Sequence, residues 1–166
     1  DEPLSNLDAL LREQVRAELK QLFKEQQKPV VYVTHDQLEA MQMGDKIVVM
    51  NHGVVEQFGV PQDIYDWPAT LFVADFIGSV NILEGKVVSS GDGHVEIDGP
   101  DGKFVGAVRS HAPADGATAW FAIRPEKMRV SREKPDGVDN AIKGEVWDIG
   151  YLGDMTIVNI RLESGK

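Results

Sequence analysis

The sequence predicts two consecutive parts of different fold class, an α/β part over residues 1–78 and an all-β part over residues 79–166. In the first part, apolar residues recur at the three- and four-residue steps of an amphipathic helix, and a continuous apolar run follows. From Val80 onward, short β-like segments are separated by Gly, Pro and Asp. Turn signals at this density predict a small antiparallel barrel or sandwich.

The first part begins with an amphipathic helix. Its apolar positions are Leu7, Leu11, Val15, Leu19, Leu22 and Phe23. Asp8 is well placed to cap this helix, and Lys28-Pro29 marks its end. The run Val-Val-Tyr-Val over residues 30–33 has no polar alternation, which predicts a strand buried on both faces. This strand is expected to stop at Thr34-His35-Asp36.

Three short helices and a hairpin are expected in the rest of the first part. Asp36 and Glu39 have the spacing of a capping box, so a helix is expected with Asp36 as its cap and Gly44 after its end. Residues 47–50 and 54–57 flank Asn51-His52-Gly53, which predicts a hairpin. Pro61 opens a second short helix, and a third is expected over residues 70–76.

The second part is expected to contain seven short β segments. They are residues 83–88, 93–97, 103–108, 117–123, 128–130, 144–149 and 155–162. The chain ends at Gly165-Lys166 just after the last of them, which leaves open whether this domain is complete.

The overall composition excludes several classes of function. Acidic residues number 27 and basic residues 17, so the formal net charge is −10. This balance argues against nucleic-acid binding through a broad basic surface, and weakly against adsorption to anionic lipid. No cysteine is present, which excludes a disulfide frame and a thiolate metal site. We expect no transmembrane segment and no signal peptide, and the start at Asp1 without Met indicates a piece of a longer protein.

Two adjacent acids, Asp1 and Glu2, open the chain. Two acids at a terminus are by themselves most often simply solvated, but here they begin the string DEPLSNLD. This string resembles the end of the Walker B strand and the following D-loop of ABC ATPases. The resemblance implies that Asp1 holds Mg²⁺, directly or through water, and that Glu2 is the general base for the attacking water. It also implies that Ser5, Asn6 and Asp8 lie at a dimer interface beside the opposing nucleotide.

His35 lies at the end of the predicted strand, in Val-Thr-His-Asp. One interpretation is a polar residue that merely ends a strand. The other is functional, because α/β sites lie beyond the carboxyl ends of strands, where an imidazole can reach a γ-phosphate. The string resembles the switch histidine of ABC ATPases, which implies that His35 senses the γ-phosphate. The remaining histidines are interpreted as structural or exposed, since no pair has metal-ligand spacing: His52, His94 and His111.

The resemblance covers nearly the whole chain. Residues 1–78 are similar to the C-terminal half of an ABC nucleotide-binding domain, a P-loop α/β domain. The string IVVMNHGVVEQFGVPQDIYDWPATLFVADFIG matches the segment that closes it in importers built like the maltose ATPase. Residues 79–166 resemble the appended OB-type (TOBE) regulatory domain through AIRPEKMRV and GEVWDIGYLGDMTIVNIRLESGK. FIGSVNILEG and YLGDMTIVNIRL are most similar to putrescine or spermidine importer ATPases, although sugar, glycerol-phosphate and ferric-iron importers share such strings.

This resemblance implies a subunit that couples ATP hydrolysis to solute uptake, with ATP and Mg²⁺ as cofactors. The implied partners are a second copy of the subunit, transmembrane permease subunits and, indirectly, a solute-binding protein, with no nucleic acid. The implied location is peripheral, at the cytoplasmic face of the plasma membrane.

Two sequence motifs of this family are missing from the chain. It contains no G-x-x-x-x-G-K-[ST] loop and no LSGGQ-like signature. Both lie upstream of the paired acids in the family, so the chain alone is expected to be inactive as an ATPase. A competing interpretation is a non-catalytic regulatory or small-molecule-binding module.

Overall fold

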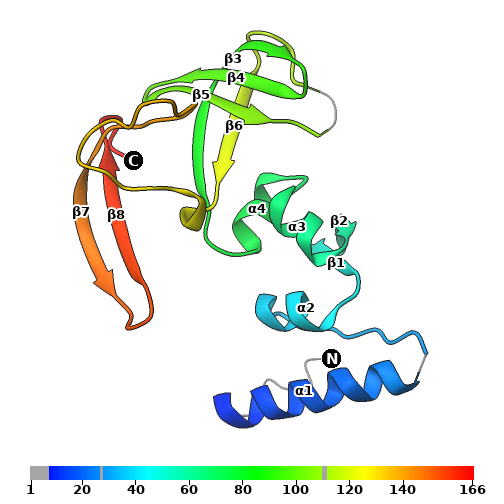
Figure 1. Cartoon of the computed structure of the whole chain (residues 1–166). Coiled ribbons are helices and arrows are strands. Elements are labelled where there is room, and N and C mark those ends of the chain that lie inside the picture. Colours follow the sequence, from blue (N-terminus) through cyan, green and yellow to red (C-terminus); the bar gives the residue numbers. More distant parts are fainter. Residues whose placement is uncertain (1–7, 27, 110–111) are drawn as a thin grey trace. The chain divides into compact units, whose positions relative to one another are not determined.

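The computed structural model describes residues 8–26, 28–109 and 112–166 (Figure 1). The chain divides into two compact units, Asp1–Ser79 and Val80–Lys166. Asp1, Glu2, Ser5 and Asn6 lie outside the described residues. Among the residues that are described, no helix is long and apolar enough to span a membrane.

The first unit opens with two helices, α1 (Ala9–Gln26) and α2 (Gln37–Met43). Asp8 caps α1, because its Oδ1 accepts the backbone N–H of Leu11 at 2.9 Å. The Asp36 side chain caps α2. Lys20 Nζ on α1 donates to the backbone carbonyl of Gln42, which joins the two helices. Both predicted helices and both predicted caps are confirmed.

The predicted strand over residues 30–33 is wrong. This segment has no regular secondary structure, and three of its side chains are exposed: Val30 by 45%, Val31 by 89% and Val33 by 48%. A strand buried on both faces needs neighbouring strands to satisfy its backbone N–H and C=O groups. In the described part of the first unit the only sheet is a hairpin formed by other residues, so the run lies extended without such neighbours.

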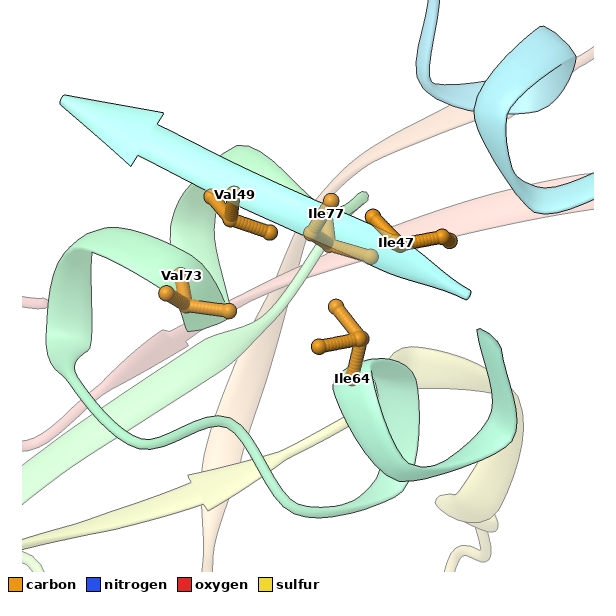
Figure 2. Close-up of a cluster of buried hydrophobic side chains, with 5 residues drawn as sticks. All are labelled: Ile47, Val49, Ile64, Val73 and Ile77. Carbon is orange, nitrogen blue, oxygen red and sulfur yellow. The ribbon is translucent and has the colours of Figure 1, made fainter. Parts of the chain in front are cut away.

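The hairpin and the last two helices of the first unit form its core. Their bounds are β1 (Ile47–Asn51), β2 (Val54–Gly59), α3 (Pro61–Asp66) and α4 (Leu71–Phe76). The hairpin turn contains His52 and Gly53 with positive φ, at 46° and 81°. Side chains of β1, α3 and α4, together with Ile77, make one buried apolar cluster, which Figure 2 shows: Ile47, Val49, Ile64, Val73 and Ile77. The predicted hairpin and helices are confirmed.

Polar side chains of β2 fix the connection between α3 and α4. Gln57 Nε2 donates to the carbonyl of Trp67 at 3.0 Å, and Gln57 Oε1 accepts the N–H of Ala69 at 2.7 Å. The neighbouring Glu56 accepts the hydroxyl of Thr70 at 3.2 Å. Thr70 in turn caps α4. One strand therefore holds the loop that positions the last helix of the unit.

Among its described residues, the second unit is all-β apart from one 3₁₀ turn. Its strands are β3 (Asn81–Gly91), β4 (His94–Gly99), β5 (Gly102–Ala107), β6 (Thr118–Ile123), β7 (Gly144–Tyr151) and β8 (Thr156–Leu162). The first four form an antiparallel sheet in the order β5-β4-β3-β6, and β7 pairs with β8. The core of the sheet is Leu83, Val87, Val95, Ile97 and Phe104. The expected all-β class of this part is confirmed.

The third-last predicted β segment, residues 128–130, is not a strand. The turn η1 (Pro125–Lys127) precedes it, and the N–H of Met128 donates to the carbonyl of Pro125 at 3.0 Å. This turn bond uses a backbone group that strand pairing would need, and Val130 remains 60% exposed. Apolar character alone was therefore a misleading signal here.

The C-terminal residues return to the sheet of their own unit. Asn140 makes two bonds to the backbone of Val105 on β5, accepting its N–H at 2.7 Å and donating to its carbonyl at 2.9 Å. Ile142 and Leu162 pack against the sheet core. Ser164 donates its hydroxyl to Asp101 at 2.7 Å. These contacts hold the β7–β8 region to the four-stranded sheet.

Candidate functional site

The candidate site is the His35 segment, defined as residues 32–39. It contains the one predicted catalytic residue that falls among the described residues. His35 is exposed and lies immediately before Asp36, the N-cap of α2. The other predicted catalytic and ligand residues, Asp1, Glu2, Ser5 and Asn6, lie outside the described residues. Asp8 is described, and its side chain caps α1.

Glu39 is the centre of a hydrogen-bond cluster in this segment. Its side chain is buried, with the residue 3% exposed. One carboxylate oxygen, Oε2, accepts the phenol O–H of Tyr32 at 3.0 Å and the hydroxyl of Thr34 at 2.8 Å. A buried carboxylate needs such donors, because desolvation of an unpartnered charge is costly.

The capping box predicted from the spacing of Asp36 and Glu39 is half correct. Asp36 Oδ1 accepts the N–H of Glu39 at 3.0 Å, as expected. In the reciprocal half, Glu39 would accept the N–H of Asp36. Instead that N–H donates to the hydroxyl of Thr34 at 3.0 Å, and the Glu39 carboxylate turns toward Tyr32 and Thr34. Thr34 thus links the two halves of the cluster.

The environment of Tyr32 reflects this cluster. Burial, and then the hydrogen bond to Glu39 and the charge of Glu39, raise the pKa of the Tyr32 phenol to about 12. The charge of Arg16 on α1 acts in the opposite direction. Arg16 is itself buried and forms an ion pair with Glu13 at 3.6 Å. The phenol therefore stays protonated and donates to Glu39 throughout the neutral range.

The chemistry available in the described part of the site is that of one exposed imidazole. An imidazole can donate a hydrogen bond to an anionic oxygen or accept one from water. Within the described residues, no group of three His, Asp or Glu side chains could hold a metal ion.

Comparison with known proteins places the chain in a family context. Residues 121–166 match the TOBE domain family. The chain is 44% identical, over 99% of its length, to the spermidine/putrescine import ATP-binding protein PotA of Chromobacterium violaceum. It is 38% identical over its whole length to the putrescine transport ATP-binding protein PotG of Escherichia coli. It is 47% identical over 83% of its length to the sn-glycerol-3-phosphate import ATP-binding protein UgpC of the same organism.

The chain is related to the ATP-binding subunits of bacterial ABC importers. The resemblance inferred from DEPLSNLD and Val-Thr-His-Asp is therefore confirmed. The chain spans less than half the length of these relatives, covering 46%, 44% and 38% of them respectively. The TOBE match runs from the second half of β6 to the last residue and includes β7 and β8. It confirms the OB-type class expected for the second part of the chain.

Sequence reasoning missed the role of Glu39 in the His35 segment. The spacing to Asp36 indicated a cap but gave no partner for the carboxylate. The available signal was the pair of hydroxyl donors, Tyr32 and Thr34, at alternate positions in an otherwise apolar run. Two donors just before a helix whose first turn carries an acid are consistent with a side-chain cluster that fixes the entry to that helix.

Proposed function

We propose that this chain is the C-terminal part of an ATP-hydrolysing subunit that drives uptake of putrescine or spermidine. The observation that carries this proposal is the 44% identity to a spermidine/putrescine import ATP-binding protein over 99% of the chain. In this proposal residues 1–78 are the C-terminal part of the nucleotide-binding domain, and residues 79–166 are the regulatory domain. The chain division after Ser79 supports these bounds.

The proposed site residues keep the roles that the resemblance implies. When bound, Mg²⁺ supplies stabilisation of the charge that develops on the β- and γ-phosphates. Asp1 would hold the metal, directly or through water, and Glu2 orients and polarises the attacking water. Ser5, Asn6 and Asp8 face the second nucleotide site across the dimer.

His35 contributes recognition of the terminal phosphate in the proposed reaction. Its imidazole donates a hydrogen bond to a γ-phosphate oxygen. The exposure of His35 just before α2 supports this role, because a buried imidazole could not meet a nucleotide. Loss of the terminal phosphate would remove that acceptor, so the segment can respond to hydrolysis.

The proposed partners are those of an import complex. Two copies of the subunit close on two ATP molecules and act on transmembrane permease subunits, which receive solute from a solute-binding protein. The subunit would lie at the cytoplasmic face of the plasma membrane. The names of the relatives, which describe import ATP-binding proteins, support this arrangement.

The chain by itself is proposed to be inactive. Its sequence contains no phosphate-binding loop, and the backbone N–H groups and lysine of such a loop hold the nucleotide phosphates. Calorimetric titration of the chain with ATP and Mg²⁺ should therefore show no saturable binding. Tight saturable binding would contradict the assignment of nucleotide binding to other residues of the subunit.

The experiment that tests the proposed activity is a substitution in the complete subunit, which joins this chain to its own upstream residues. Glu2→Gln removes the base but preserves size, so ATP turnover should fall by about 10² to 10⁴. Glu25→Gln is the matched control, because Glu25 is exposed near the end of α1. Turnover of Glu2→Gln equal to that of the control would remove Glu2 from the mechanism.

A second candidate solute has a specific observation in its favour. Over 83% of the chain the identity to the sn-glycerol-3-phosphate import ATP-binding protein is 47%. Uptake of labelled putrescine, spermidine and sn-glycerol-3-phosphate should be compared in cells with and without the complete subunit. Loss of polyamine uptake alone supports the first candidate, and loss of glycerol-phosphate uptake alone supports the second.

A further inference from the structure

We propose that Glu39 is a positioning residue for His35, its carboxylate acting through the hydroxyl of Thr34, the residue before the histidine. This inference rests on the proposed function, in which His35 meets the terminal phosphate of ATP. Glu39 itself is buried, whereas His35 is exposed. Glu39 therefore controls the histidine from inside the protein without contacting the nucleotide.

The geometry of the cluster connects Glu39 to both neighbours of His35. On the N-terminal side, the Glu39 carboxylate accepts the hydroxyl of Thr34 at 2.8 Å. On the C-terminal side, the backbone N–H of Glu39 donates to Asp36 Oδ1 at 3.0 Å. The N–H of Asp36 also donates to the hydroxyl of Thr34 at 3.0 Å, which closes a ring of bonds that includes both neighbours of His35. The backbone of residue 35 is thus fixed at both ends.

Tyr32 extends this control along the chain. Its phenol donates to the same carboxylate oxygen at 3.0 Å. Residues 30–33 form no strand, so no sheet ladder positions the approach to His35 in the described structure. Side-chain bonds to Glu39 supply the constraint that a strand would otherwise give. Removing the carboxylate leaves Tyr32 and Thr34 without their acceptor and releases the segment.

Release of the segment would affect turnover more than nucleotide binding. In the proposed function, His35 contacts the terminal phosphate only, while other parts of the subunit hold the nucleotide. A displacement of about 1 Å in a group that positions a reacting centre can cost about 100-fold in rate. The expected signature of Glu39→Ala is therefore a fall in kcat of about 10- to 100-fold with KM for ATP little changed.

The test compares four substitutions in the complete subunit. His35→Ala tests the proposed function, Glu39→Ala tests the positioning role, and Glu39→Gln keeps an acceptor oxygen of the same reach. Glu18→Ala is the control, because Glu18 is an exposed carboxylate on α1. Each variant is measured for kcat and KM with ATP, and for the ring resonances of histidines labelled with ¹³C. His35→Ala identifies the resonance that belongs to His35.

The proposal predicts that Glu39→Ala lowers kcat and leaves KM for ATP unchanged. It also predicts that the His35 resonance shifts toward that of a freely moving histidine. Glu39→Gln should recover most of both properties, because its amide oxygen can still accept the bonds from Tyr32 and Thr34. Glu18→Ala should match the unsubstituted subunit. An unchanged His35 resonance and unchanged kcat in Glu39→Ala would overturn the positioning role.

Failure of the proposed function gives a different result. If His35→Ala keeps normal turnover, the phosphate-sensing role of His35 is wrong, and the resonance of His35 in Glu39→Ala still decides whether Glu39 positions it. If His35→Ala loses turnover and Glu39→Ala does not, the function stands and the positioning inference is overturned. A lower kcat, a changed KM for ATP and a lower thermal stability in both Glu39 variants would show that Glu39 has a merely structural role. That result would also overturn the positioning inference.

Discussion

Gln57 should make a measurable contribution to the stability of the first unit, because one amide forms two bonds across the loop from α3 to α4. Its Nε2 donates to Trp67 at 3.0 Å and its Oε1 accepts from Ala69 at 2.7 Å. If each bond contributes about 0.5–1.5 kcal/mol, Gln57→Ala should lower the free energy of unfolding by about 1–3 kcal/mol. Gln57→Glu keeps the acceptor but loses the donor, and places a carboxylate oxygen against the carbonyl of Trp67. Gln57→Glu should therefore lower the free energy of unfolding by at least the contribution of one hydrogen bond.

The assay for Gln57 is urea unfolding followed by the fluorescence of Trp67, in a background carrying Trp120→Phe and Trp147→Phe. Both replaced tryptophans belong to the second unit and are partly exposed, at 48% and 65%. Gln62→Ala is the matched control, because Gln62 is an exposed glutamine on α3. The free energy of unfolding of Gln62→Ala should stay within about 0.5 kcal/mol of that of the parent protein. The bidentate role is refuted if Gln57→Ala unfolds at the same urea concentration as this control.

Three further predictions concern the two cores and the cluster. Ile64→Ala empties a fully buried position and should lower the free energy of unfolding by about 2–5 kcal/mol in urea unfolding. Gly85→Ala should lower the free energy of unfolding of the second unit by roughly 1–3 kcal/mol, because a Cβ there would lie 2.7 Å from the carbonyl oxygen of Asp98. Urea unfolding followed by the fluorescence of Trp120, with Trp67 and Trp147 replaced by Phe, measures this change. The Tyr32 phenol has a pKa of about 12 in the folded protein against 10.0 as its ordinary value, so its contribution to stability is complete below pH 10 and is lost as the pH rises to 12. Glu39→Ala should lower that pKa in an ultraviolet titration, and an unchanged value would contradict the hydrogen bond.

Local signals were sufficient for most of the fold. The β1–β2 hairpin followed from Asn51-His52-Gly53, where His52 and Gly53 adopt the positive φ values that the turn requires. The caps at Asp8 and Asp36 followed from residue type and spacing alone. Each of these features depends on atoms a few residues apart, so a single sequence contains the information needed to predict it.

Features that depend on distant residues could not be predicted in the same way. The run over residues 30–33 has the composition of a buried strand, but pairing depends on neighbours that the run itself does not specify. For the site, the position of His35 before a helix was predictable, whereas the acceptor role of the Glu39 carboxylate depended on how the chain folds back toward Tyr32. The roles of Asp1, Glu2, Ser5 and Asn6 remain predictions.

The lack of a strand at residues 30–33 and the Glu39 hydrogen-bond cluster together indicate which residues fix the backbone at His35. If pairing of residues 30–33 in a sheet were the sole determinant, a segment without strand neighbours would leave the histidine without a defined approach. Instead, the bonds among Thr34, Asp36 and Glu39 join residues no more than five positions apart. Such bonds close only short loops, so they need no sheet pairing. The bonds among Thr34, Asp36 and Glu39 therefore hold the backbone on both sides of His35 without sheet pairing. The burial of Glu39 and its bond from Tyr32, in contrast, depend on how the rest of the chain folds around them.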